Sequence, residues 1–337
     1  MSAFNRVAEN HYVLDVPGGE LAEELKPLEA VTLTELLVHK FPDREFILKP
    51  VLTLGSLTMI YSWRGVGKTH VSLGIAYAAA SGGSFWNWKA ERAFRVLYID
   101  GEMPGEALQA RVAAIVQASD EDPDPDYFRV LTIDLQGGFM PDLATRKGQA
   151  VIARECDRAE LIVVDNLSCL VRGKGRENEA ESWVLAAEWA LSMRSKGKAV
   201  VFVHHAGKDG NQRGTSKRED LLDLSISLKR PPDYEIGQGA RFEVRFEKAR
   251  HLTGADAAPF EAWLQSDEQG GQIWTRKPIS EATMERVADL ANLGMNQRDI
   301  AEELGLHKST VSRAHRKATK EGLIKNTQKG KRRADDH

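Results

Sequence analysis

The sequence predicts an α/β domain with a mainly parallel sheet, followed by a small all-α domain. Between about residues 56 and 205, short β-rich runs alternate with helical stretches, as in parallel strands joined by crossover helices. From Asn296 onward the apolar spacing is that of a helix-turn-helix. The chain has 337 residues, which is more than one hydrophobic core usually organises, so two folded domains are expected.

Composition narrows the class of protein. Hydrophobic residues make up 42% and charged residues 28%, which excludes a largely disordered chain. No run approaches ~18 apolar residues and the first residues lack the layout of a signal peptide, so a cytoplasmic protein without a membrane span is expected. Cys156 and Cys169 lack the spacing of a disulfide framework or zinc site, and we expect both to be buried.

Four segments are expected along the chain. A lead-in segment spans 1–44 and contains a short helix at 33–39. The main domain spans 45–278, a helix-turn-helix domain 279–326, and a basic flexible tail 327–337. Within the main domain, helices are expected from Gly67, at 106–117 and at 182–195. The strand candidates are SLTMIY, FRVLYID, FRVLTID, LIVVD and KAVVFVHH, and then LLDLSISL, ARFEVRFEKA and FEAWL as a more antiparallel edge. The segment DEQGGQIWTRKPIS is expected to close the domain with turns.

A phosphate-binding loop is predicted between the first strand and the first helix of the main domain. Small residues let backbone N–H groups turn toward phosphate oxygens, and the helix N-terminus adds its dipole. Lys68 would reach the β- and γ-phosphates of ATP, and Thr69 would ligate Mg²⁺. Ser62 replaces the usual first glycine, whereas the half that touches phosphate is intact. The loop residues are Ser62, Trp63, Arg64, Gly65, Val66, Gly67, Lys68 and Thr69.

Two further strands end in carboxylates where ligands bind in open α/β sheets. LIVVD ends at Asp165, the candidate second anchor for Mg²⁺. FRVLYID leads into Glu102, the candidate general base for an attacking water, with Asp100 as the competing acid. The alternative that Glu102 caps or pairs within a loop stays open.

Polar residues at two other strand ends complete the candidate site. His204 and His205 end KAVVFVHH and can sense a γ-phosphate; a metal site is disfavoured because adjacent strand residues face opposite ways. Lys248 and Arg250 lie two residues apart on one strand face. They can project into a neighbouring subunit's nucleotide as an arginine finger does, or form a solvated strand edge.

Together these motifs resemble the RecA/KaiC-like ATPases, especially the plasmid RepA-type hexameric replicative helicases and related ATPases of mobile elements. The resemblance covers about residues 45–264 and depends on SWRGVGKT, YIDGEMP, LIVVDNLS, VVFVHHAGK with RGTSKREDLLD, and FEKAR, in that order. It implies a RecA-like P-loop ATPase core assembled as a homo-oligomeric ring, with ATP at subunit interfaces. It also implies Glu102 as the base, His204 or His205 as sensor, and Lys248 and Arg250 acting in trans.

The same resemblance places two basic, glycine-rich loops at the central pore of the ring. Such loops suit contacts with a single-stranded DNA backbone, although neither loop has an aromatic residue for base stacking. The candidate DNA-binding residues are Arg172, Lys174 and Arg176 in the first loop, and Lys208, Arg213, Lys217 and Arg218 in the second.

The C-terminal segment matches the helix-turn-helix pattern. Asn296 can cap a helix with Ile300, Ala301 and Leu304 inward, and Gly305 makes the turn. The second helix buries Val311 and Ala314, and the KEGLI segment leads toward a wing. A duplex DNA contact is expected, with protein docking as the alternative. The residues left for DNA are Lys308, Ser309, Thr310, Arg313, Arg316 and Lys317.

Charge asymmetry agrees with a DNA contact at this end. From Lys308 onward, ten basic and three acidic residues give a net charge of +7, whereas the whole chain carries -3. The expected function is an ATP-driven oligomeric DNA motor, a replicative helicase or loader of a plasmid, phage or integrative element. The alternative is an ATP-switched regulator that assembles on duplex DNA without translocating. A small-molecule kinase is disfavoured because no acceptor-binding element is visible.

Overall fold

The computed structural model describes residues 4–8, 11–14, 24–25, 29–41, 43–172, 179–206, 220–266 and 271–325. The chain divides into two compact units, Met1–Asp43 and Arg44–His337. In the first unit, β1 (Phe4–Ala8), β2 (His11–Leu14) and β3 (Glu24–Leu25) form a small antiparallel sheet. Helix α1 (Leu33–Val38) confirms the short helix expected there, and Thr32 caps it together with Glu35.

The second unit is built on a nine-stranded sheet with the order β10-β9-β11-β12-β6-β13-β14-β15-β16. The first six strands in this order pair in parallel, and the last three are antiparallel. Of the three strands expected at a more antiparallel edge, β14 and β15 are antiparallel, whereas β13 pairs in parallel with β6. The strands are β6 (Leu57–Ser62), β9 (Val96–Asp100), β10 (Phe128–Thr132), β11 (Leu161–Asp165), β12 (Ala199–His205), β13 (Leu224–Lys229), β14 (Arg241–Ala249), β15 (Phe260–Ser266) and β16 (Gln272–Pro278).

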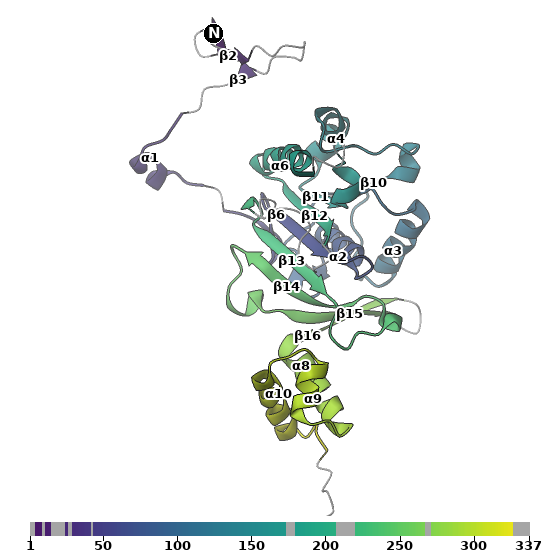
Figure 1. The fold of residues 1–337 in the computed structure, drawn as a ribbon. Helices are drawn as coiled ribbons and strands as arrows, with labels where there is room; N and C mark the ends of the chain where they lie inside the picture. The colour runs from purple at the N-terminus through teal and green to yellow at the C-terminus, as the bar shows by residue number, and fades with distance from the viewer. Residues whose placement is uncertain are drawn as a thin grey trace, which may run out of the picture. The chain divides into compact units, whose positions relative to one another are not determined.

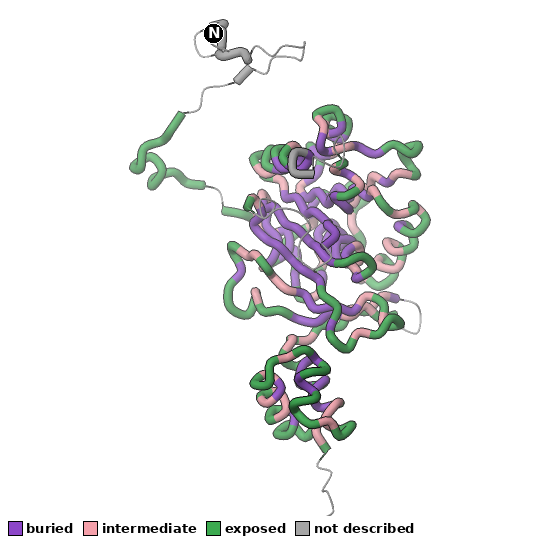
Figure 2. The backbone as a smooth tube through the Cα atoms, in the orientation of Figure 1, coloured by how far each residue is buried: buried purple, intermediate pink, exposed green. Residues whose placement is uncertain are grey.

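Successive strand residues point to opposite faces of the sheet. In the parallel strands the side chains on both faces are mostly apolar, and helices cover both faces. Tyr98 and Val163 pack in a core with α2 and α3, whereas Leu97 and Val164 pack in a second core with α4 and α6. The sheet is therefore buried between two layers (Figures 1 and 2). The helices are α2 (Lys68–Ser81), α3 (Gly105–Gln117), α4 (Arg146–Arg158), α5 (Leu167–Leu170) and α6 (Glu179–Ser195).

Short elements complete this domain. Two small hairpins are β4 (Phe46–Leu48) with β5 (Leu52–Thr53), and β7 (Ser84–Phe85) with β8 (Trp88–Lys89). Single 3-10 turns lie at Ile133–Gln136, Ile236–Gln238 and Gly254–Ala257. Aromatic rings of the second hairpin meet those of the antiparallel strands, for example Trp86 and Phe260 at 5.0 Å between ring centroids.

The C-terminal domain is a three-helix unit formed by α8 (Ile279–Asn292), α9 (Gln297–Glu303) and α10 (Lys308–Lys320). The Asn296 side chain accepts from the first N–H groups of α9, as predicted, and Gly305 takes the left-handed conformation in the turn with a φ of 59°. The predicted inward residues Ile300, Ala301, Leu304 and Val311 are buried, and Ala314 packs against them. Val287 of α8, which was not predicted, belongs to the same core. Among described residues 321–325 no strand follows α10, so the wing stays a prediction.

Three local expectations were wrong or incomplete. Gln272–Pro278 is a strand rather than a closing turn, because it pairs with β15 over seven residues. Helix α4 was not anticipated, although Thr145 caps it and Ile152 and Cys156 are on its buried face. Cys156 is buried as expected, but Cys169 is only partly so. Within the described ranges, no helix is long and apolar enough to cross a membrane.

Candidate nucleotide site and DNA-binding helices

The candidate nucleotide site lies where the parallel strands end. Asp165 of β11 pairs in register with Asp100 of β9, and His205 of β12 pairs with Ser62 of β6. Four strands therefore deliver their carboxyl ends to one edge of the sheet, where ligands bind in open α/β sheets. A cavity of about 530 Å³ opens there, and P-loop residues line it together with Glu102, Asp165 and His205.

The loop Ser62–Thr69 surrounds the amino group of Lys68. Lys68 Nζ donates to the carbonyls of Ser62 and Trp63 at 3.2 Å each and lies 3.4 Å from Ser62 Oγ. The Ser62 hydroxyl thus contributes to the lysine site. Burial lowers the pKa of Lys68 to about 8, with Asp165 and Glu102 opposing that shift.

The other loop residues divide by environment. Arg64, Gly65, Gly67 and Thr69 line the cavity, whereas Val66 is buried in the core and Trp63 is half-exposed. Glycine is required at position 67, where φ is 133° and an added Cβ would lie 2.7 Å from the Phe242 ring.

The two predicted magnesium ligands lie together. Asp165 is buried, and burial raises its pKa above the ordinary value. Hydrogen bonds with the hydroxyls of Tyr98 and Thr69 oppose this shift but are the smaller effect. Tyr98 donates to Asp165 Oδ2 at 2.6 Å, and Ser72 lies 3.4 Å from the same oxygen. Hydroxyl and carboxylate oxygens are ligands that Mg²⁺ prefers, so these residues fit such an ion. Tyr98 and Ser72 were not predicted from the sequence, because they belong to different elements, β9 and α2.

Glu102, the predicted base, faces the cavity and contacts two polar side chains. Asn166 Nδ2 donates to Glu102 Oε2 through a short hydrogen bond, and His205 Nε2 lies 3.6 Å from the same oxygen. Asn166 Nδ2 is itself 3.3 Å from His205 Nε2. The three side chains therefore form one connected group at the ends of β9, β11 and β12. Asn166 directly follows Asp165 and was not singled out from the sequence.

Asp100, the competing acid, has a different role in the structure. Its Oδ1 accepts from the backbone N–H groups of Glu102 and Met103 at 3.3 Å, so it organises the turn that carries Glu102. Asp100 is fully buried, and burial raises its pKa to about 6. Its place outside the cavity lining favours Glu102 as the base.

The two histidines differ in whether they reach the cavity. Both are buried, but only His205 lines the cavity. No group of three or more His, Cys, Asp or Glu side chains suited to a metal ion occurs among the described residues. The geometry thus favours His205 for the sensor role.

Two other cavity residues were not anticipated. Arg111 of α3 and His70 of α2 line the cavity beyond Thr69. Burial, with the nearby charge of Arg111, lowers the pKa of His70 to about 4, so the imidazole is neutral at pH 7. A GKT motif does not specify the residue that follows it, here His70, and Arg111 lies on another helix.

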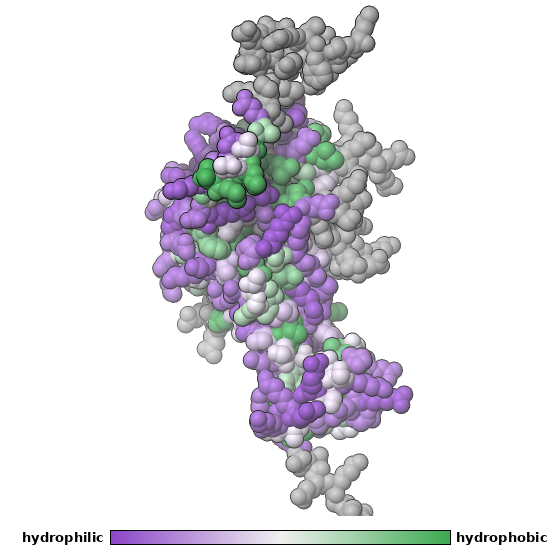
Figure 3. All heavy atoms as spheres, turned by 90° about the vertical axis from the view of Figure 1, so that its left-hand side faces the viewer, coloured by the Kyte–Doolittle hydropathy of each residue, from purple (hydrophilic) through white to green (hydrophobic). Residues whose placement is uncertain are grey.

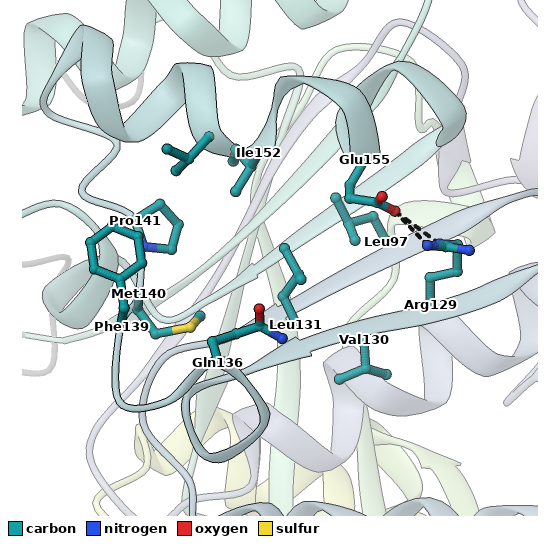
Figure 4. A pocket seen from close by; sticks show the side chains of 11 residues that line it. Leu97, Arg129, Val130, Leu131, Gln136, Phe139, Met140, Pro141, Ile152 and Glu155 are labelled. Atoms are coloured by element: carbon teal, nitrogen blue, oxygen red, sulfur yellow. Dashed lines mark hydrogen bonds and ion pairs between the residues drawn. The ribbon is translucent and has the colours of Figure 1, made fainter.

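A separate hollow of about 550 Å³ lies beside the edge strand β10 and contains none of the predicted residues. Figure 4 shows Phe139, Met140 and Pro141 on one side of it and Arg129, paired with Glu155, on the other. Its lining residues do not include the phosphate-binding loop, so it is not the nucleotide site.

Lys248 and Arg250 lie at the opposite end of the strands. Ala249 pairs with Leu224 at the start of β13, and Leu224 pairs with Thr58 near the start of β6. The P-loop follows Ser62, four residues farther along β6, or about 13 Å at the rise of a strand. Both side chains donate to the carbonyl of Asp220, Lys248 at 3.2 Å and Arg250 at 3.0 Å. They are therefore far from the nucleotide site of their own chain.

The candidate single-strand contacts fall mostly outside the described residues. Arg172 is described, and it donates to the carbonyl of Met140 at 2.8 Å. Its neighbours Lys174 and Arg176 lie outside the described ranges, as do Lys208, Arg213, Lys217 and Arg218.

The candidate duplex contacts lie on α10. Thr310 is half-buried, and the remaining five predicted residues are exposed: Lys308, Ser309, Arg313, Arg316 and Lys317. Arg313 Nε donates to the carbonyl of Ser309 at 3.2 Å, and Lys317 lies 3.7 Å from Glu321. The face of the C-terminal helices seen in Figure 3 is mostly hydrophilic. A solvated basic helix face of this kind suits a groove of duplex DNA.

Comparison with known families agrees with this geometry. The family described as AAA domain matches residues 22–211, more than half of the chain. The chain belongs to this AAA domain family. A second family, described as winged helix-turn-helix DNA-binding, matches residues 290–325. Nothing among the curated proteins matches the chain. This AAA protein thus combines an ATPase domain of RecA-like fold with a helix-turn-helix of a DNA-binding class.

Solved structures with similar folds include two archaeal proteins. A KaiC-like protein, PH0186 from Pyrococcus horikoshii OT3, is 14% identical, with a TM-score of 0.45, and the match covers 69% of this chain and 94% of that one. The flagellar accessory protein FlaH from Methanocaldococcus jannaschii is 10% identical, also with a TM-score of 0.45, over 66% of this chain and 90% of that one.

Proposed function

We propose that this AAA protein is an oligomeric ATP-driven DNA motor, a replicative helicase or helicase loader of a plasmid, phage or integrative element. The observation that supports it most is the contact of Glu102 with Asn166 and His205. His205 ends β12, and the chain then enters the loop assigned to the pore by resemblance. A movement of Glu102 during hydrolysis would therefore pass through His205 to the loop that is proposed to hold single-stranded DNA.

The side chains at this edge have separable roles in the proposed hydrolysis. Lys68 binds the β- and γ-phosphates, and Thr69 with Asp165 holds Mg²⁺, which supplies charge neutralisation at the phosphates. Glu102 orients the attacking water and accepts its proton. Asn166 and His205 hold the Glu102 carboxylate in place, and His205 responds when the γ-phosphate leaves.

The oligomeric part of the proposal depends on Lys248 and Arg250. They lie at the opposite end of the strands from the P-loop, so they act on the nucleotide of an adjacent subunit. A closed homo-oligomer, which we take to be a hexamer, gives every nucleotide such a neighbour. Cations that meet the γ-phosphate in trans would couple hydrolysis to subunit movement.

The test combines three measurements on the full chain. ATP hydrolysis is measured with and without single-stranded DNA, native mass gives the assembly, and strand displacement is followed on a forked duplex. Both a helicase and a loader require stimulation by single-stranded DNA, and a helicase also requires ATP-dependent displacement; Lys68→Ala should lack these activities. ATP hydrolysis by an assembled protein that never displaces a strand would exclude a helicase.

A second candidate, an ATP-switched regulator of duplex binding, is favoured by one observation. Arg286 of α8 is buried and pairs with Glu261 through a short contact and with Asp233 at 2.5 Å. Three residues before Asp233, Arg230 donates to the carbonyl of Gly65 in the P-loop at 3.2 Å. One short segment thus touches both the nucleotide loop and the helix-turn-helix domain. A regulator would show ATP-dependent duplex affinity without strand displacement.

A further inference from the structure

Three arginines gather around one buried carboxylate at the amino ends of the parallel strands. The Asp223 side chain, 5% exposed, precedes β13, and its Oδ2 accepts from the backbone N–H of Leu57 at 3.0 Å. Its Oδ1 lies 3.8 Å from Arg44, 3.6 Å from Arg194 and 4.0 Å from Arg250. The arginines come from the segment before β4, the end of α6 and the end of β14, so tertiary structure alone brings them together.

The distances leave the guanidinium groups with donors to spare. A direct bond between guanidinium and carboxylate is about 2.7–2.9 Å long, shorter than any of the three contacts. Among the described residues, Arg44 and Arg194 make no hydrogen bond through their guanidinium groups, and Arg250 uses one nitrogen on the carbonyl of Asp220. Asp223 therefore holds the arginines near one another without occupying their N–H groups.

Among the described residues, cations outnumber anions at this place. Within that part of the chain, the three arginines face one carboxylate, that of Asp223. Arg44 and Arg250 keep about half of their side chains exposed, at 53% and 52%, so an anion can approach from solvent.

We propose that Arg44, Arg194 and Arg250, ordered by Asp223, form an anion site for the terminal phosphate of ATP bound to a neighbouring copy of this chain. The inference rests on the proposed ring ATPase and deepens it, because it adds Arg44 and Arg194 to the trans group and makes Asp223 its positioning residue. Guanidinium forks bind two phosphate oxygens at once, and charge developing on the three equatorial oxygens in the transition state can be met by several forks.

The first test uses the full-length protein with Arg44→Ala and Arg194→Ala. Each change is expected to lower kcat for ATP hydrolysis at least about tenfold while affinity for a fluorescent ATP analogue stays within about twofold, because the loss is in the transition state. Arg158→Ala is the matched control, since Arg158 lies at the same end of the strands, is exposed and pairs at 3.6 Å with Glu155. An unchanged kcat in both variants would overturn the inference.

The second test shows whether the site acts between subunits. Asp223→Asn keeps an oxygen for the Leu57 N–H but removes the charge, so kcat should fall without loss of nucleotide affinity. Mixed with Glu102→Gln, both Asp223→Asn and Arg194→Ala should recover activity in mixed assemblies verified by native mass. A purely structural defect would give no recovery, and Arg194→Lys, which keeps a charge, provides a second variant if Arg194→Ala does not fold.

The outcomes separate this inference from the proposed function. If the wild-type protein does not hydrolyse ATP, the proposed function itself fails. If it hydrolyses ATP, Lys68→Ala is inactive, and the arginine variants keep full kcat, then only the anion site is wrong. If the variants instead bind single-stranded DNA with a flatter salt dependence and unchanged kcat, the anion is a DNA phosphate and the inference is overturned.

Discussion

The two ends of the parallel strands carry sites of opposite character. At the carboxyl ends, Lys68, Asp165 and Glu102 line a single cavity, and the charges of Asp165 and Glu102 act on Lys68. At the amino ends, Arg194 and Arg250 share one carboxylate, and cations outnumber anions among the described residues. The first end has the parts to bind and hydrolyse a nucleotide, whereas the second has charge for a ligand that this chain does not supply. This difference is what we expect of the proposed ring, in which each subunit would contribute half of a composite site.

The largest expected effect is at the carboxyl end. Lys68→Ala should abolish detectable ATP binding, because it removes the lysine of the phosphate-binding loop, whose charge would meet the β- and γ-phosphates. Binding of a fluorescent ATP analogue measures the loss, and retained native mass would show that the fold survives. Near-normal affinity of this variant for ATP would mean that the nucleotide does not bind at the carboxyl ends of the strands.

Glu102→Gln should separate binding from chemistry at the same end. Glutamine keeps the hydrogen bond from Asn166 but cannot accept a proton, so ATP affinity should remain while kcat falls about 1000-fold. Single-turnover hydrolysis checks this. Hydrolysis at the wild-type rate would transfer the base role to Asp100 or another acid, and Asp100→Asn is the variant to compare.

Arg250→Ala tests the amino end and should lower kcat about 100-fold with ATP affinity nearly intact, because the remaining cations of the cluster still meet the transition state. Subunits of Arg250→Ala and Glu102→Gln, each weak alone, should regain activity when mixed. Absence of recovery in verified mixed rings would assign Arg250 a role within its own subunit, or a structural one.

The pKa of Lys68 gives a smaller effect with a definite sign. With a pKa of about 8, Lys68 is charged below pH 8 and neutral above it. The phosphates need the charged form, so binding above pH 8 takes up one proton, and affinity should fall up to about tenfold per pH unit there while staying level below pH 7. Titrations from pH 6.5 to 9.5 test this; affinity that is constant to pH 9.5 would contradict the shifted pKa.

How far the sequence predicted this molecule depends on where the information lies along the chain. The P-loop, Asp165 and the helix-turn-helix core are local patterns, and their elements lie where they were expected. Asn166 and Tyr98 were missed because their roles depend on which strands become neighbours. The Asp223 cluster joins residues from 44 to 250, a separation no motif spans. β16 was missed because glycines before it suggested turns, whereas pairing with β15 decides its conformation.

The smallest effect on hydrolysis is expected from changes in the helix-turn-helix domain, because neither the nucleotide site nor the arginine cluster includes residues of that domain. Truncation after Pro278 should spare ATPase activity and assembly but weaken duplex binding. The truncation also exposes Glu261, the buried partner of Arg286, so substitutions in the intact chain measure duplex binding better. Arg313→Gln and Lys317→Gln should therefore be compared in the full-length protein, where both side chains are exposed on α10.

Removing a cation that binds a phosphate should flatten the slope of log affinity against log salt by about one unit, a signature that misfolding does not produce. Glu321→Gln is a matched control, since it frees Lys317 from its partner at 3.7 Å without removing a cation. Fluorescence anisotropy across a salt series, on duplex and single-stranded probes, measures these slopes. If both cation variants bind duplex with unchanged affinity and slope, α10 is a protein-docking helix, and DNA contact must be sought at the strand ends instead.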